Sequence, residues 1–179
     1  MANEVLKKIR ELMELGFSDE HLIAILEGIG MGLTDEQLEV VIKLEFSAAQ
    51  IKMLLHGYEK YLTKEQVKMA ANVEFDYEQM YQVLQGFEDG LTQEQVKIYA
   101  KSCFSSHQMR EIREGFSRGL ADSKVRVYAI AEFVSEQMLQ IRMGFENLTK
   151  EQVLVYAKPE FNSAQMYQTP FEFDTFEQN

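Results

Sequence analysis

The sequence is poor in the residues that break helices or cross-link a chain. It has only two prolines among 179 residues, Pro159 and Pro170, and no tryptophan. Because proline is the strongest helix breaker, the long stretch without it favours an all-helical fold. The single cysteine, Cys103, cannot form an internal disulfide bond, and its place beside Phe104 predicts a small packed side chain. A reducing cytoplasm is the compartment that fits this cysteine usage best.

Signals of membrane insertion and of catalysis are also lacking. No run approaches the roughly 18 apolar residues that span a bilayer, and the charged N-terminal stretch is unlike a secretory signal. None of the three histidines, His21, His56 and His107, stands with a second His or Cys at zinc-ligand spacing. The glycines form no phosphate-binding loop. We therefore expect no membrane partner, no metal or other cofactor, and no enzymatic activity.

The charge is strongly acidic but uneven. The formal net charge is −11, which argues against attachment to nucleic acid through the whole surface. Residues 62–90 have a net charge of −4, whereas residues 91–119 have a net charge of +2. An acidic chain with one basic segment either meets a partner of positive or mixed charge or is simply a solvated surface.

What the sequence does contain is a repeat of about 29 residues. Phenylalanines recur at this spacing, and so do a leucine before each first helix and a glycine in each second helix. The phenylalanines are Phe17, Phe46, Phe75, Phe104, Phe133 and Phe161. Six copies follow from this spacing, with the bounds 4–32, 33–61, 62–90, 91–119, 120–147 and 148–168. We interpret residues 1–168 as one helical-repeat domain and residues 169–179 as an acidic and aromatic tail.

Each repeat contains two helix starts of the same kind. Thr92 with Gln95 and Asp76 with Gln79 have the spacing of a capping box, in which a polar side chain caps the helix and the glutamine reaches back. The second helix carries a buried stripe at helical spacing, as at Met80 and Val83. The same pattern recurs along the chain, so two helices per repeat are predicted.

A single pair of helices buries too little apolar surface to fold alone. The pattern therefore predicts an all-α fold, an α-solenoid of about six stacked two-helix repeats with a short irregular C-terminal tail. The recurrent glycine at Gly86 is expected where a neighbouring helix approaches closely. Gly90, Gly119 and Asn147 are expected to end second helices in a left-handed conformation.

Two positions change chemistry along the repeats and are candidates for partner contacts. At one second-helix position the leucines of the early repeats, such as Leu84, give way to Arg113 and Arg142, with Arg110 nearby. These arginines would suit carboxylates or phosphates of a partner, or would pair with neighbours such as Glu114.

The second such position lies on the first helix, where Tyr99, Tyr128 and Tyr156 replace smaller residues. They predict either packing between repeats or an exposed recognition strip. In the tail, Phe171, Phe173 and Phe176 alternate with acidic residues. They either cover the open end of the last repeat or dock on a partner.

The string LTxEQVxxYA…F(S/D)xxQMxxIxxGFExGL, best matched between residues 62 and 168, resembles short two-helix repeats of proteins from Firmicute phages and conjugative elements. This resemblance implies a helical-repeat architecture in the cytoplasm of a bacterial host. Small acidic helical proteins of such elements include inhibitors of host defence, among them anti-CRISPR proteins that bind Cas nucleases. The repeat itself does not fix an activity.

Two function hypotheses follow. The first is a noncatalytic protein-binding module, an inhibitor of the anti-CRISPR type that blocks a nucleic-acid-handling enzyme such as a Cas nuclease by occupying its basic surface. The alternative is a module that binds nucleic acid directly through the basic segment 97–126, or a structural scaffold of a mobile element. The sequence does not indicate an oligomeric state.

Overall fold

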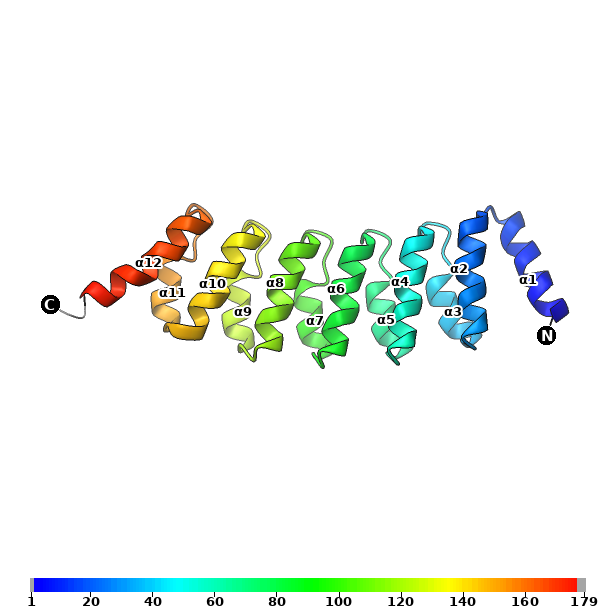
Figure 1. Ribbon diagram of the computed structural model, residues 1–179, viewed down its shortest axis with the longest axis horizontal. Coiled ribbons are helices and arrows are strands. Elements are labelled where there is room, and N and C mark those ends of the chain that lie inside the picture. Colours follow the sequence, from blue (N-terminus) through cyan, green and yellow to red (C-terminus); the bar gives the residue numbers. More distant parts are fainter. Residues whose placement is uncertain (1, 177–179) are drawn as a thin grey trace. The chain divides into compact units, whose positions relative to one another are not determined.

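The computed structural model describes residues 2–176 of the chain, and side chains from Val5 to Thr169 (Figure 1). Within this range it contains twelve helices and no strand, which confirms the predicted all-α class. The helices α1 (Ala2–Glu14) and α2 (Asp19–Gly30) form a first pair. Five pairs of helices of unequal length follow.

The two helices of each pair differ in length. The first helices of the five later pairs have seven residues each and are α3 (Asp35–Val41), α5 (Lys64–Ala70), α7 (Gln93–Tyr99), α9 (Asp122–Tyr128) and α11 (Lys150–Tyr156). The second helices are longer and are α2 (Asp19–Gly30), α4 (Ala48–Glu59), α6 (Tyr77–Glu88), α8 (Ser106–Ser117), α10 (Ser135–Asn147) and α12 (Ser163–Phe176).

Capping boxes begin most of these helices, as the sequence predicted. The Thr92 side chain accepts a hydrogen bond from the Gln95 amide, and the Gln95 side chain accepts one from the Thr92 amide. Asp76 and Gln79 exchange the same two bonds at the start of α6. Because these bonds satisfy backbone donors that a helix start leaves open, the repeated motif fixes where each helix begins.

The chain divides into two compact units, Met1–Leu84 (unit 1) and Gln85–Asn179 (unit 2). In unit 1, α2 packs on α4, and α3 and α4 both contact α5. In unit 2, α10 packs between α8 and α12 while α9 contacts both α8 and α10 (Figure 1). Within each unit, therefore, neighbouring second helices lie side by side, and the first helices cover one flank of them.

The repeated apolar positions form the core of each unit. The phenylalanines before the second helices, such as Phe46, Phe75 and Phe133, are at most 2% exposed. The predicted stripe of α6 is buried as well, with Met80 and Val83 fully inaccessible to solvent. A hairpin therefore buries one face within itself and another against its neighbour, as a repeat fold requires.

The ends of the second helices agree with the sequence at two positions and differ at a third. Gly90 and Gly119 both have φ of 82°, which is the left-handed conformation predicted for them. Asn147 was expected to do the same, but α10 includes it, and the next residue, Leu148, is extended. The reason is the repeat length, because this repeat is one residue shorter and has no residue left for a left-handed turn.

The C-terminal segment also differs from the expected irregular tail. The helix α12 continues across Pro170 as far as Phe176. A proline inside a helix loses one backbone hydrogen bond, but its fixed φ is compatible with helical backbone. The length of α12 follows the second helices of the other repeats, so the repeat pattern extends further than the proline suggested. The side chains of Phe171, Phe173 and Phe176, predicted as partner contacts, lie outside the described residues.

Candidate functional site

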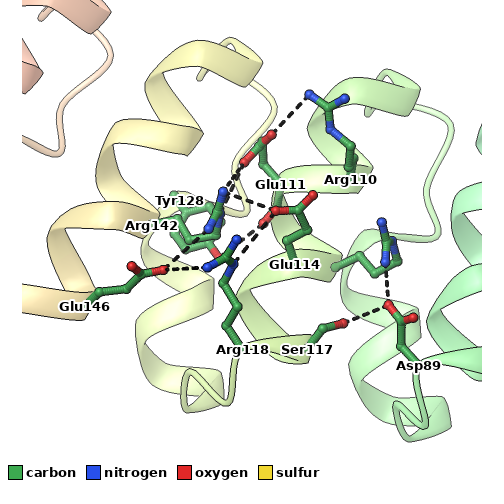
Figure 2. A network of polar contacts seen from close by, with 10 residues as sticks. Asp89, Arg110, Glu111, Glu114, Ser117, Arg118, Tyr128, Arg142 and Glu146 are labelled. Atoms are coloured by element: carbon green, nitrogen blue, oxygen red, sulfur yellow. Dashed lines mark hydrogen bonds and ion pairs between the residues drawn. The ribbon is translucent and has the colours of Figure 1, made fainter.

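A network of arginines and carboxylates lies between α8 and α10 in unit 2 (Figure 2). At its centre is Arg142, which is only 4% exposed. Its Nη2 atom lies 3.0 Å from Glu111 Oε2 and 3.2 Å from Glu114 Oε2, and its Nη1 lies 3.5 Å from Glu146 Oε1. Nε donates a further hydrogen bond of 3.2 Å to Glu111 Oε2. One buried guanidinium thus holds three carboxylates, which is a use of its planar fork of donors that lysine could not reproduce.

Two arginines complete the network from its solvent side. Arg110 Nη2 lies 3.3 Å from Glu111 Oε1, and the Arg110 side chain is about half exposed. Arg118 Nη1 lies 3.6 Å from Glu146 Oε1, and its Nε lies 3.9 Å from Glu114 Oε2. Three arginines therefore face three glutamates, and the network is neutral as a whole. A buried ion pair of this kind fixes how neighbouring hairpins fit more than it adds net stability.

The other predicted arginine, Arg113, pairs with Asp89 at the end of α6. Asp89 also accepts hydrogen bonds from Ser117 Oγ at 2.9 Å and from Gln85 Nε2 at 3.1 Å. Burial alone would raise the pKa of Asp89, but the hydrogen bonds from Gln85, Ser117 and Arg113 outweigh it and lower this pKa. Arg113 and Arg142 thus both bind carboxylates of this chain, and most of these carboxylates belong to the preceding hairpin. Of the predicted arginine set, Arg110 alone leaves about half of its side chain to solvent.

The three tyrosines predicted as partner contacts are in the core. Tyr99, Tyr128 and Tyr156 are each 0% exposed, so they offer no surface to a partner and the expectation of a recognition strip is corrected. Burial raises the pKa of Tyr156 to about 12 and also raises the pKa of Tyr99 and Tyr128 well above the usual tyrosine value.

The recurrent glycines explain where the tyrosines point. A Cβ atom built on Gly115 would lie 1.8 Å from the hydroxyl oxygen of Tyr128, and Gly86 has the same relation to Tyr99. Gly144 stands in the same way opposite Tyr156. Each glycine is therefore the socket for the phenol of the next hairpin, which confirms the close approach predicted for this position.

The glutamines of the second helix starts have a second function that the sequence did not reveal. Gln108 Nε2 donates to Phe133 O at 2.6 Å and to Ala131 O at 3.1 Å, while its Oε1 caps its own helix. Gln137 makes the same bonds to Phe161 and Pro159 in the next hairpin. A carboxylate cannot donate onward, so the use of Gln, and of His21 in the first repeat, instead of Glu at this position was the available signal.

The remaining reactive side chains do not converge. Cys103 is exposed, which corrects the expectation of a packed side chain, because Phe104 takes the core position and leaves Cys103 in the loop. Between Val5 and Thr169, no group of three His, Cys, Asp or Glu residues is arranged to hold a metal ion. Across the part of the chain that is described, no helix is long and apolar enough to cross a membrane.

Exposed carboxylates, here called the loop glutamates, lie in four of the loops that join first and second helices. The residue before the core phenylalanine is glutamate in four repeats, and none of the four forms an ion pair with any described residue. These residues are Glu45 and Glu74 in unit 1 and Glu132 and Glu160 in unit 2. By contrast, several basic side chains of the segment 97–126 are engaged, with Lys97 Nζ 2.7 Å from Glu94 and Lys124 Nζ 3.2 Å from Phe145 O. Arg126 is exposed and forms no ion pair with a described residue.

Comparisons of the chain with protein-family models, with curated proteins and with solved structures found no match. The arrangement of side chains described above is therefore the basis for a functional proposal.

Proposed function

We propose that the chain is a noncatalytic protein-binding module of a phage or other mobile element that inhibits a host defence nuclease of the Cas type. Its acidic surface would occupy the basic surface with which such a nuclease holds nucleic acid in the bacterial cytoplasm. The observation that carries the proposal is the set of exposed loop glutamates, Glu45, Glu74, Glu132 and Glu160, without ion-pair partners among the described residues. Exposed carboxylates of this kind supply the charge complementarity that steers an acidic protein to a basic partner.

We also propose that the six repeats stack into one α-solenoid. The repeat runs through the sequence without interruption, and the packing of second helices on their neighbours is the same kind of contact in both units. In such an array, equivalent residues of successive repeats form a continuous row. The four glutamates would then form one acidic edge along the molecule, and small-angle X-ray scattering would test the elongated shape.

The alternative of direct nucleic-acid binding has less support. Three of the four arginines of the segment 97–126 are paired internally, among them Arg113 with Asp89 and Arg118 with Glu114 and Glu146, whereas Arg126 is exposed and has no ion-pair partner among the described residues. A phosphate would have to displace these carboxylates at a cost in energy. Binding to DNA at low salt that weakens steeply with added salt would favour this alternative over the inhibitor.

The inhibitor proposal is tested by adding the purified protein to a panel of Cas nucleases loaded with guide RNA and measuring DNA binding. The expected result is stoichiometric loss of DNA binding by at least one nuclease, weaker at high salt. The variant with the four loop glutamates changed to Gln should lose this inhibition. The matched control changes four glutamates at first-helix starts, and these are Glu36, Glu65, Glu94 and Glu151.

This control removes the same charge from a different edge, and it should still inhibit. Equal loss in both variants would mean that net charge alone acts, and absence of inhibition across the panel would contradict the proposal.

A further inference from the structure

Unit 1 has a surface patch that combines exposed apolar side chains with carboxylates. We propose that this patch is a docking surface for a basic amphipathic helix of a protein partner. It is formed by two interhelical loops and the start of α6, and we call it the loop patch. Its residues are Leu44, Glu45, Val73, Glu74, Tyr77, Glu78 and Tyr81.

The two loops of the patch are held side by side by hydrogen bonds between neighbouring hairpins. Lys43 Nζ donates to Ala71 O at 3.3 Å, and Gln50 Nε2 donates to Phe75 O at 2.6 Å. The helices α3 and α5, which precede the two loops, also pack against each other. The loops therefore form one preformed surface, and a partner would lose little entropy in ordering it.

The apolar residues of the patch each leave a large part of their surface to solvent. Leu44 is 51% exposed and Val73 is 48% exposed, because the phenylalanines two residues later, Phe46 and Phe75, take the buried position of each loop. Tyr77 and Tyr81 are 50% and 38% exposed and stand one turn apart on α6. Large apolar side chains grouped in this way on an outer surface are typical of a binding site, whereas isolated ones are not.

The carboxylates of the patch include two without an ion-pair partner among the described residues. Glu45 and Glu74 form no ion pair with any residue that the structure describes. Glu78 accepts a hydrogen bond from the Tyr77 hydroxyl. The negative charges of Glu78 and Asp76 raise the pKa of that hydroxyl. The lysine nearest in sequence, Lys43, has its Nζ 5.1 Å from the centre of the Phe46 ring.

The next repeat, which belongs to unit 2, does not carry the same surface. At the positions equivalent to Val73, Tyr77 and Tyr81 it has Ser102, Ser106 and Arg110. The repeat scaffold therefore accepts polar residues at these positions and does not itself require the apolar ones. The apolar side chains of unit 1 are thus an addition to the scaffold, which is expected of a specificity element.

The apolar and acidic side chains of the patch together determine which kind of partner fits it. Apolar side chains flanked by carboxylates complement a helix that has leucine or similar residues on one face and Lys or Arg beside it. The inference rests on the proposed function in one respect, since a basic nucleic-acid-binding protein is where such a helix would be found. It goes further in naming the element that is bound and the part of this chain that binds it.

The experiment uses the full chain and a defined probe. The probe is a fluorescein-labelled amphipathic helix of 18 leucine and lysine residues, and binding is followed by fluorescence anisotropy. The test variant is Val73→Ser with Tyr77→Ser, which copies the serines of the next repeat and so should fold normally. We expect this variant to bind the probe about tenfold more weakly than the wild type.

Two controls separate the patch from general attraction of opposite charges. Ser102→Ala with Ser106→Ala changes the equivalent positions of the next repeat and should leave the affinity unchanged. A lysine and serine peptide of equal charge should bind about tenfold more weakly than the leucine and lysine probe. Equal affinity of the test variant and the wild type, or equal affinity for both peptides, would overturn the inference.

The same variant distinguishes this inference from the inhibitor proposal. If the variant loses the probe while no Cas nuclease is inhibited by the wild type, the loop patch stands and the inhibitor proposal fails. If a nuclease is inhibited equally by the wild type and the variant, the inhibitor proposal stands and the loop patch is not its docking surface.

Discussion

The space beside the recurrent glycine of the second helix is filled by different side chains in unit 1 and in unit 2. In unit 1, a Cβ built on Gly57 would lie 2.9 Å from Leu84 Cδ2, so the leucine of the next second helix occupies the socket. In unit 2, the socket at Gly115 receives the hydroxyl of Tyr128 from the next first helix. The leucine position of that hairpin is then Arg142, which turns to the carboxylates. When a tyrosine of the next first helix fills the socket, the leucine position of the next second helix no longer has to fill it and can hold an arginine. This exchange explains why tyrosine and arginine occur together in that hairpin.

The largest expected effect comes from breaking the buried ion pair of unit 2. We expect Arg142→Leu to destabilise the protein by about 3 to 5 kcal/mol, because Glu111 would remain buried without its main partner. A leucine there cannot enter the socket, since Tyr128 already occupies it. Urea denaturation followed by circular dichroism measures the loss.

The comparison also predicts how to recover this loss. The triple variant Glu111→Met, Tyr128→Ala and Arg142→Leu copies Met53, Ala70 and Leu84 of the earlier repeats. We expect it to recover most of the stability lost in Arg142→Leu, because it reproduces the arrangement in which Leu84 fills the socket at Gly57 in unit 1. A triple variant as unstable as Arg142→Leu alone would show that the two arrangements are not interchangeable.

The next largest effect concerns the sockets themselves. Gly115→Ala should cost about 2 to 3 kcal/mol, because its Cβ would overlap the Tyr128 hydroxyl. Gly57→Ala should stay within about 1 kcal/mol of the wild type, since a leucine methyl can move and alanine favours the helix. Adding Tyr128→Phe to Gly115→Ala removes the overlapping oxygen and should restore most of the stability. Equal costs for the two glycines would contradict this distinction between the units.

Alkaline pH provides a third test. Burial raises the pKa of Tyr156 to about 12, and it also raises the pKa of Tyr99 and Tyr128. In unit 1 the buried tyrosine is Tyr58, and burial raises its pKa to about 12 as well. A raised folded-state pKa gives stability that is complete below the unfolded value of about 10 and is lost as pH rises towards the folded value.

We therefore expect the free energy of unfolding to fall between about pH 10 and 12. The fall should be smaller in Tyr128→Phe, and Tyr61→Phe serves as the control because Tyr61 is 95% exposed. Urea titrations at several pH values measure both slopes, and identical slopes in the wild type and Tyr128→Phe would contradict the assignment.

The smallest expected effect is at the end of α4. Tyr61 has φ of 61°, where unit 2 has Gly90 and Gly119 at equivalent positions. Tyr61→Gly should stabilise the protein by up to about 1 kcal/mol, because glycine avoids the cost of a left-handed side chain. Gly119→Ala should destabilise it by about 1 kcal/mol. Thermal unfolding of both variants tests the pair, and a loss of stability in Tyr61→Gly would contradict the assignment of strain.

Features that depend on one hairpin could be predicted from the sequence. The capping boxes, the buried stripe and the left-handed glycines are set by residues within a few positions of one another, as at Thr92 and Gln95. The spacing of the phenylalanines also predicted which residues form the core. Pro170 was misleading, because a local rule for stopping a helix did not prevail over the repeat pattern that continues past it.

Features that depend on two hairpins could not be predicted. The burial of Tyr128 requires knowledge of the glycine socket opposite it, and the pairing of Arg142 requires the position of Glu111 on the preceding second helix. The onward bond of Gln108 likewise ends on a carbonyl 25 residues away. The repeats do hold one usable signal, since tyrosine and arginine appear together in two copies, those of Tyr99 and Tyr128, and reading these changes as a pair would have placed both inside.

The glycine sockets have a consequence for how this chain can change in length during evolution. A hairpin of the tyrosine kind presents a socket on one side and a phenol on the other, so an extra copy inserted by unequal recombination between Gly86 and Tyr156 would fit both of its new neighbours. When one tyrosine hairpin directly follows another, its phenol meets the glycine of the hairpin before it, so the contact between the two hairpins is unchanged. Gene duplication can thus extend unit 2 without new compensating mutations, provided that the crossover preserves the 29-residue phase.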